Sequence, residues 1–113
     1  MADTKTAEDL VYEVAGILGK IIAGESLGAV EYQTIDGKID GVLGRIRSIV
    51  YIGDRDAIPI EYFDNIALMV SQFAGAKFSN SPPDLAAVKG LEQDLRYLVA
   101  DSPTYEVLKS EYF

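Results

Sequence analysis

The stretch PIEYFDNIALMVSQFAG, which runs from Pro59 to Gly75, decides the fold. Pro59 suits the first position of a helix, where its missing N–H is not needed, and Glu61 follows in the first turn. Apolar side chains then recur every three or four residues on one face: Phe63, Ile66, Ala67, Val70, Phe73 and Ala74. Because this helix carries the widest apolar surface in the chain, we expect it to be the central one, ending between Gly75 and Asn80.

Two helices are predicted before it. Thr6 is a suitable cap for the first, with acidic residues following in its first turn, and Gly24 is a suitable end. Ser26 is a suitable cap for the second, which we expect to continue to about Ser48. The β-branched and aromatic segment 49–52 is compatible with an extended strand, and residues 53–56 indicate a turn.

A fourth helix is predicted after Ser81-Pro82-Pro83-Asp84, with Ser81 as its cap and Pro82 in its first position. Glu92 and Arg96 are spaced as an i,i+4 ion pair on its flank. The sequence thus predicts an all-α fold, a four-helix bundle with an irregular or short β connection at about 49–57. We divide the chain into a helical domain, residues 1–103, and an extended C-terminal arm, residues 104–113. The apolar stripe of the fourth helix is Leu85, Val88, Leu91, Leu95, Leu98 and Val99.

The second predicted helix has two contrasting faces. At about 100° per residue, Ile35, Ile39 and Val42 lie with other apolar residues on the side that serves the core. The opposite side, here called the glycine face, consists of Val30, Thr34, Gly37, Gly41, Gly44 and Ser48. Each glycine costs about 1 kcal/mol inside a helix relative to alanine. We expect the face to contact a neighbouring subunit; close packing against another helix of the same chain, or a kink, is the alternative.

The composition limits the functions open to the chain. Its 113 residues fit one domain, and 18 acids against 10 bases give a net charge of −8, which disfavours gripping nucleic acid. The lysines and arginines form no run. No segment approaches the roughly 20 apolar residues of a membrane span, so we expect no membrane contact.

The residue types also argue against catalysis. The chain has no Cys and no His, which excludes thiol nucleophiles, Ser-His-Asp relays and Cys or His metal sites. Its acids lie outside the apolar stripes, so we interpret them as solvated surface charge. The turn Asp54-Arg55-Asp56 does not fit a calcium loop, since Pro59 and Asn65 stand where Gly and Glu are needed. We expect no enzyme activity, no cofactor and no metal.

The C-terminal arm is unusually apolar for a chain end. We expect it either to fold back on the bundle or, as we favour, to dock on another chain. The docking residues would be Tyr105, Val107, Leu108, Tyr112 and Phe113.

Two motifs resemble a known family. The segment 23–34, Ala-Gly-Glu-Ser-Leu-Gly-Ala-Val-Glu-Tyr-Gln-Thr, is similar to the entry into the second helix of phage head-to-tail adaptor proteins, also called head-completion connectors or tail accessory factors that stabilise packaged DNA. The segment 58–63, Ile-Pro-Ile-Glu-Tyr-Phe, resembles the entry into their third helix. The order of helices matches over about residues 7–100. This chain departs from many relatives in having no Trp, and its C-terminal part is short.

The resemblance implies a structural part of a virion and no catalysis. It implies a homo-oligomeric ring, usually of about twelve copies, in the neck between head and tail, seated between the portal protein and tail proteins. DNA would pass through the lumen without specific binding, assembly taking place in the host cytoplasm. The alternative is a small acidic helical module that regulates or binds another protein in the cell.

Overall fold

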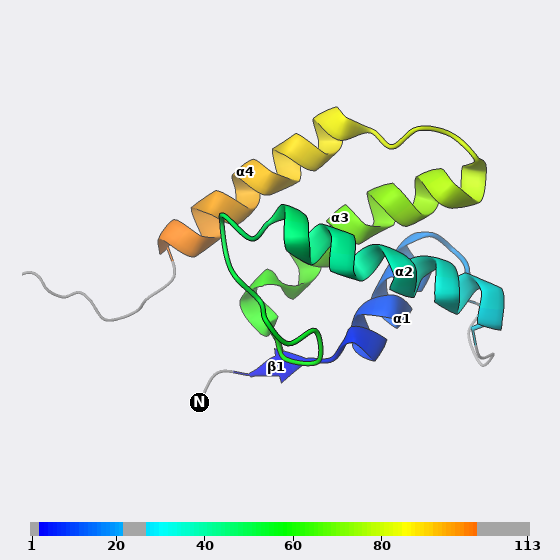
Figure 1. The fold of residues 1–113 in the computed structure, drawn as a ribbon, viewed down its shortest axis with the longest axis horizontal. Helices are drawn as coiled ribbons and strands as arrows, with labels where there is room; N and C mark the ends of the chain where they lie inside the picture. The colour runs from blue at the N-terminus through cyan, green and yellow to red at the C-terminus, as the bar shows by residue number, and fades with distance from the viewer. Residues whose placement is uncertain (1–2, 22–26, 102–113) are drawn as a thin grey trace, which may run out of the picture.

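The structure, a computed structural model, describes residues 3–21 and 27–101, apart from the Asp101 side chain. Within these ranges it confirms a helical fold of four helices: α1 (Ala7–Ile17), α2 (Ala29–Arg45), α3 (Ile60–Ser79) and α4 (Leu85–Asp101). Strands β1 (Thr4–Lys5) and β2 (Ile58–Pro59) form a small antiparallel sheet, with Thr4 opposite Pro59 and Lys5 opposite Ile58 (Figure 1). The predicted arm, residues 104–113, lies outside the described residues.

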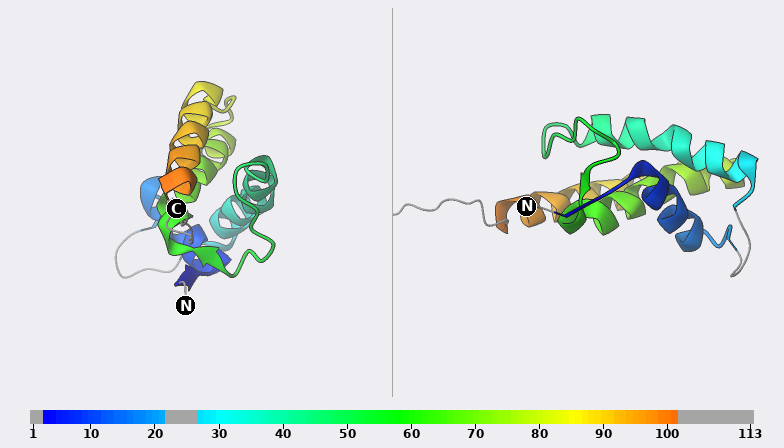
Figure 2. Two further views of the ribbon diagram at one scale, coloured as in Figure 1. Left: turned by 90° about the vertical axis from the view of Figure 1, so that its left-hand side faces the viewer. Right: turned by 90° about the horizontal axis from the view of Figure 1, so that it is seen from below.

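Helix α3 is central, as its sequence predicts. It packs against α1, α2 and α4, and the end-on view in Figure 2 shows α2 to one side while α3 and α4 stack beside it. Of the predicted core face only Phe73 stays half-buried; Tyr62 and Met69, expected on the flank, are buried as well. None of the helices in the described part of the chain is long and apolar enough to span a bilayer.

Helix α1 begins as predicted and ends early. The Thr6 hydroxyl accepts from the Asp9 N–H while the Asp9 carboxylate accepts from the Thr6 N–H, both at 3.1 Å, which forms a capping box. The predicted end at Gly24 is wrong, because α1 stops at Ile17 and Gly19 takes the left-handed conformation, φ 70°. The Lys20 N–H then bonds back to the Ala15 carbonyl at 2.8 Å, closing the last turn.

The predicted bounds of the second helix are wrong by a few residues. Gly28 caps α2, and Ser26 lies outside the described residues. The helix ends at Arg45 rather than at Ser48, since the Ile49 and Val50 N–H groups both return to the Ile46 carbonyl and tighten the chain into turns. Residues 50–57 have no regular strand; the extended pair lies just after them, at Ile58–Pro59, where β1 supplies a partner.

The two proline signals were placed slightly wrongly. Pro59 caps α3 from outside, because its ψ of 134° is extended, and Ile60 is the first helical residue. The cap of α4 is Asp84 rather than Ser81: its carboxylate accepts from the Ala87 N–H and its carbonyl from the Val88 N–H, each at 3.1 Å. A residue before proline is disfavoured in the helical region, so Pro83 prevents Pro82 from starting the helix.

Helix α4 packs through a narrow stripe. Val88 and Leu95 are buried, whereas the predicted stripe residues Leu85 and Leu98 are 49% and 41% exposed. The predicted Glu92–Arg96 pair is not formed; Glu92 instead accepts from Arg45 of α2 at 2.6 Å. This contact joins α4 to a helix other than α3, which is why spacing within one helix did not reveal it.

Candidate subunit interface and adjoining pocket

The glycine face lies on the surface of the described structure. A Cβ atom added at Gly37, Gly41 or Gly44 would meet no heavy atom within 4 Å, and all three residues are exposed. Within residues 3–21 and 27–101, therefore, no other helix comes close to these positions. Helix α2 also runs through them without interruption. Neither close packing inside the described fold nor a break in the helix explains why glycine stands there.

The other predicted interface residues lie around these glycines. Val30 is 71% exposed in the first turn of α2, and the Thr34 hydroxyl donates to the Val30 carbonyl at 2.9 Å. Ser48 is exposed too, but it lies in the turns that follow α2 rather than on the helix. The face is thus continuous along α2 and ends at Gly44. The predicted docking residues Tyr105, Val107, Leu108, Tyr112 and Phe113 lie outside the described residues.

The turn Asp54-Arg55-Asp56, which does not fit a calcium loop, connects two helices through its side chains. The Arg55 guanidinium contacts the carboxylates of Asp36 and, at 3.5 Å, Asp40, both on α2. The Asp56 carboxylate accepts from the Ala7 N–H at 3.1 Å, at the start of α1. The turn thereby ties α1 to α2. The spacing of Asp36 and Asp40, one helical turn apart, was the available signal.

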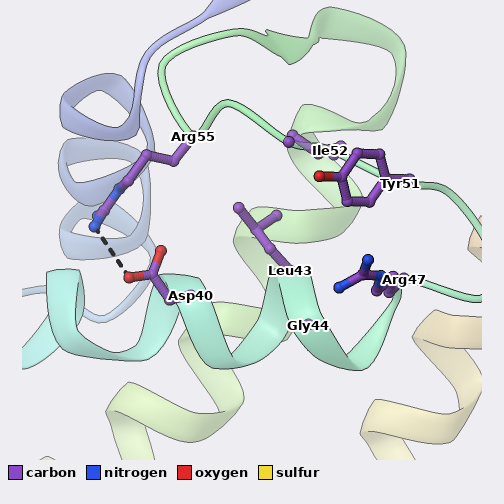
Figure 3. A pocket seen from close by; sticks show the side chains of 8 residues that line it. Asp40, Leu43, Gly44, Arg47, Tyr51, Ile52 and Arg55 are labelled. Carbon is purple, nitrogen blue, oxygen red and sulfur yellow. Dashed lines mark hydrogen bonds and ion pairs between the residues drawn. The ribbon is translucent and has the colours of Figure 1, made fainter.

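A shallow pocket of about 270 Å³ adjoins the glycine face at Gly44 (Figure 3). On one side Arg55 points toward Asp40; on the other, Arg47 lies beneath the Tyr51 ring, with Leu43 between them. The Arg47 guanidinium carbon is 5.1 Å from the centre of that ring, a cation–π contact. The pocket is lined by Asp40, Leu43, Gly44, Arg47, Tyr51, Ile52, Gly53 and Arg55. No sequence pattern predicts this pocket, because its residues come from α2 and from the irregular connection after it.

The contact between α1 and α2 is aromatic. The rings of Tyr12 and Tyr32 meet edge to face, with centres 6.3 Å apart and planes at 70°. Burial raises the pKa of the Tyr32 phenol, and the nearby carboxylates of Glu8 and Asp36 raise it further. We interpret the contact as packing between the two helices. Among the described residues, no cluster of acidic side chains is arranged to hold a metal ion.

No family model, curated protein or solved structure matches the chain. The site therefore has to be interpreted from its own geometry.

Proposed function

We propose that this chain is a structural head-to-tail adaptor, or connector, subunit of a bacteriophage or phage-like particle. In this proposal, copies of the chain form a ring between portal and tail through which DNA passes. The observation that supports it best is the exposed glycine face of α2, where three glycines meet nothing in the described fold. The order of the two motifs at residues 23–34 and 58–63 supports the family assignment.

The energetic argument starts from the cost of the glycine face. Three glycines in an exposed helix weaken the monomer by on the order of 3 kcal/mol relative to three alanines. Nothing within the described residues offsets this by closer packing at those positions. A second backbone that approaches the bare face does offset it, since side chains would hold that backbone farther away. The gain then appears only on assembly.

The charge of the chain suits a ring around DNA. The net charge of −8 suits a proposed lumen that repels the phosphate backbone, so that DNA slides through it rather than binds. A ring of identical subunits needs a head-to-tail contact between two different surfaces of each copy. In the proposal the glycine face is one of them, and the C-terminal arm reaches the portal or tail rings.

The decisive experiment places a large side chain on the bare face. Gly41→Leu replaces a glycine that weakens the helix, and the new side chain enters open space. The monomer should therefore keep its helical circular dichroism spectrum and become slightly more stable. The same side chain should block the approach of a neighbour and abolish rings in sedimentation velocity and electron micrographs. Gly90→Leu is the matched control, because Gly90 is an exposed glycine of α4 that also meets nothing within 4 Å.

The outcomes separate the proposal from its alternative. Rings in the wild type and in Gly90→Leu, but not in Gly41→Leu, support the adaptor. Rings that survive Gly41→Leu count against the glycine face as the lateral contact. A wild type that stays a compact monomer or dimer at high concentration favours instead a small acidic regulatory or binding module.

A further inference from the structure

The pocket beside Gly44 contains an arginine, Arg47, that forms no ion pair with the described residues. Two arginines, Arg47 and Arg55, face one carboxylate, Asp40, although the whole chain has a net charge of −8. Arg55 is already paired with Asp36 and Asp40. Arg47 has no carboxylate partner anywhere in residues 3–21 or 27–101. Its guanidinium is therefore available to a carboxylate from outside the described fold.

One wall of the pocket depends on a glycine, Gly53. A Cβ at Gly53 would come within 2.9 Å of the Tyr51 hydroxyl oxygen and 3.1 Å of its ring, so the absence of a side chain lets the tyrosine lie over the turn. Tyr51 in turn covers the Arg47 guanidinium. Figure 3 shows the Tyr51 hydroxyl and the Arg47 guanidinium both directed toward the Leu43 side of the pocket. A guanidinium in a cation–π contact keeps its N–H groups, and two of them can donate parallel hydrogen bonds to one carboxylate.

An acidic counterpart lies on a different part of the same chain. A second hollow, of about 620 Å³, is formed over β1 and α1 by Lys5, Glu8, Asp9, Tyr12, Glu13 and Phe63, and it shares no residue with the first. Asp9 is engaged in the capping box of α1, and Glu8 lies close enough to Tyr32 to raise the pKa of that phenol. Glu13 is exposed and forms no ion pair within the described ranges.

We propose that Arg47, together with the Tyr51 hydroxyl, receives the Glu13 carboxylate of a second copy of this chain. The proposal rests on the ring function above and specifies the polar part of its lateral contact. An arginine in one hollow and a glutamate in the other, each without an ion pair among the described residues, are complementary groups on two different surfaces, as a head-to-tail contact that builds a ring requires. Asp40 in the wall is paired with Arg55 at 3.5 Å, so Arg47 is the cation of this pocket that remains to receive the carboxylate. The contact is placed at the Gly44 end of the glycine face, so the two act as one surface.

The direct test is a zero-length crosslink that preserves the charge. In Arg47→Lys the new amine keeps the positive charge, and a carbodiimide can join it to a carboxylate only when the two groups touch. Mixing ¹⁴N-labelled and ¹⁵N-labelled protein identifies links between copies by mass spectrometry. We expect a mixed-isotope peptide joining positions 47 and 13. Arg96→Lys is the matched control, because Arg96 is an exposed arginine of α4 outside both hollows.

A charge exchange tests the energetics. Arg47→Glu should raise the concentration needed for half-assembly by roughly tenfold or more, and adding Glu13→Arg in the same chain should restore much of the loss. Arg96→Glu makes the same change of charge on α4 and should leave assembly unchanged.

The possible failures are distinct. Rings that form without a 47–13 link and that are indifferent to Arg47→Glu overturn this contact and leave the adaptor proposal standing. A wild type that never assembles overturns both. If Arg47→Glu lowers retention on a DNA column while assembly is intact, the pocket serves a phosphate backbone and the proposal is wrong.

Discussion

Helices α2 and α3 differ in how much of their surface is buried. On α3, apolar side chains are buried around much of the circumference, because α1, α2 and α4 all pack against it. On α2, one side is buried through Ile35, Ile39 and Val42, while the opposite side carries glycines on which none of the described residues packs. The fold explains the residues of α3 and the buried side of α2. Within residues 3–21 and 27–101 nothing packs on the glycine face, although its glycines weaken the helix, so we look for its purpose outside the described fold.

The largest effect should come from the core of α3. Ile66 is completely buried, so Ile66→Ala removes apolar contacts and leaves a cavity. We expect the free energy of unfolding to fall by about 2–5 kcal/mol in chemical denaturation. Leu68→Ala is the control on the same helix, because Leu68 is 42% exposed. A similar loss for both variants would show that α3 is not the centre that the structure describes.

The next largest effect should come from the glycine face, through Gly41→Ala. An alanine there should raise the free energy of unfolding of the monomer by about 1 kcal/mol, because the methyl group enters open space and the helix gains propensity. Gly75→Ala on α3 should gain less, since its Cβ would lie 3.1 Å from a methyl carbon of Leu18, which must give way. Both values are to be measured by denaturation at concentrations where sedimentation shows a monomer. An equal gain at the two positions would mean that packing does not distinguish the two glycines.

Periodicity predicted the helices well and their ends less well. The apolar repeat over 59–75 identified α3 and its central place because that signal comes from many residues at once. A helix end depends on a few local bonds. The prediction for α1 failed because the helix already stops at Ile17, where Gly19 follows in the left-handed conformation. The prediction for α4 failed because two successive prolines shift the cap to Asp84.

Of the candidate site, the glycine face could be predicted from the sequence and the adjoining pocket could not. The glycine face follows from helical spacing, so its position on α2 could be predicted, although its covering by another subunit stays a prediction. The pocket could not be predicted in the same way. Arg47, Tyr51 and Arg55 come together only because the chain after α2 turns back over the helix and the Asp54–Asp56 turn attaches to α1 and α2. Contacts between an irregular segment and a helix produce no periodic pattern in the sequence.

The smallest effect concerns the inner flank of α2, where Tyr32 meets Tyr12. Burial and the neighbouring carboxylates raise the pKa of Tyr32 above its ordinary value of 10.0, so the folded chain holds the phenol proton more tightly than the unfolded chain. This contribution to stability is complete below pH 10 and is lost as the pH rises through the folded pKa, because the unfolded chain then releases its proton first. Tyr32→Phe should remove that alkaline decline. The measurement is the free energy of unfolding of the monomer between pH 9 and 11. Tyr97→Phe on α4 is the control, because it also removes one phenol. A decline as steep in Tyr32→Phe as in the wild type would mean that the α1–α2 contact does not hold the neutral phenol. In that case the described fold would leave the residues on a second side of α2 unexplained, in addition to those of the glycine face.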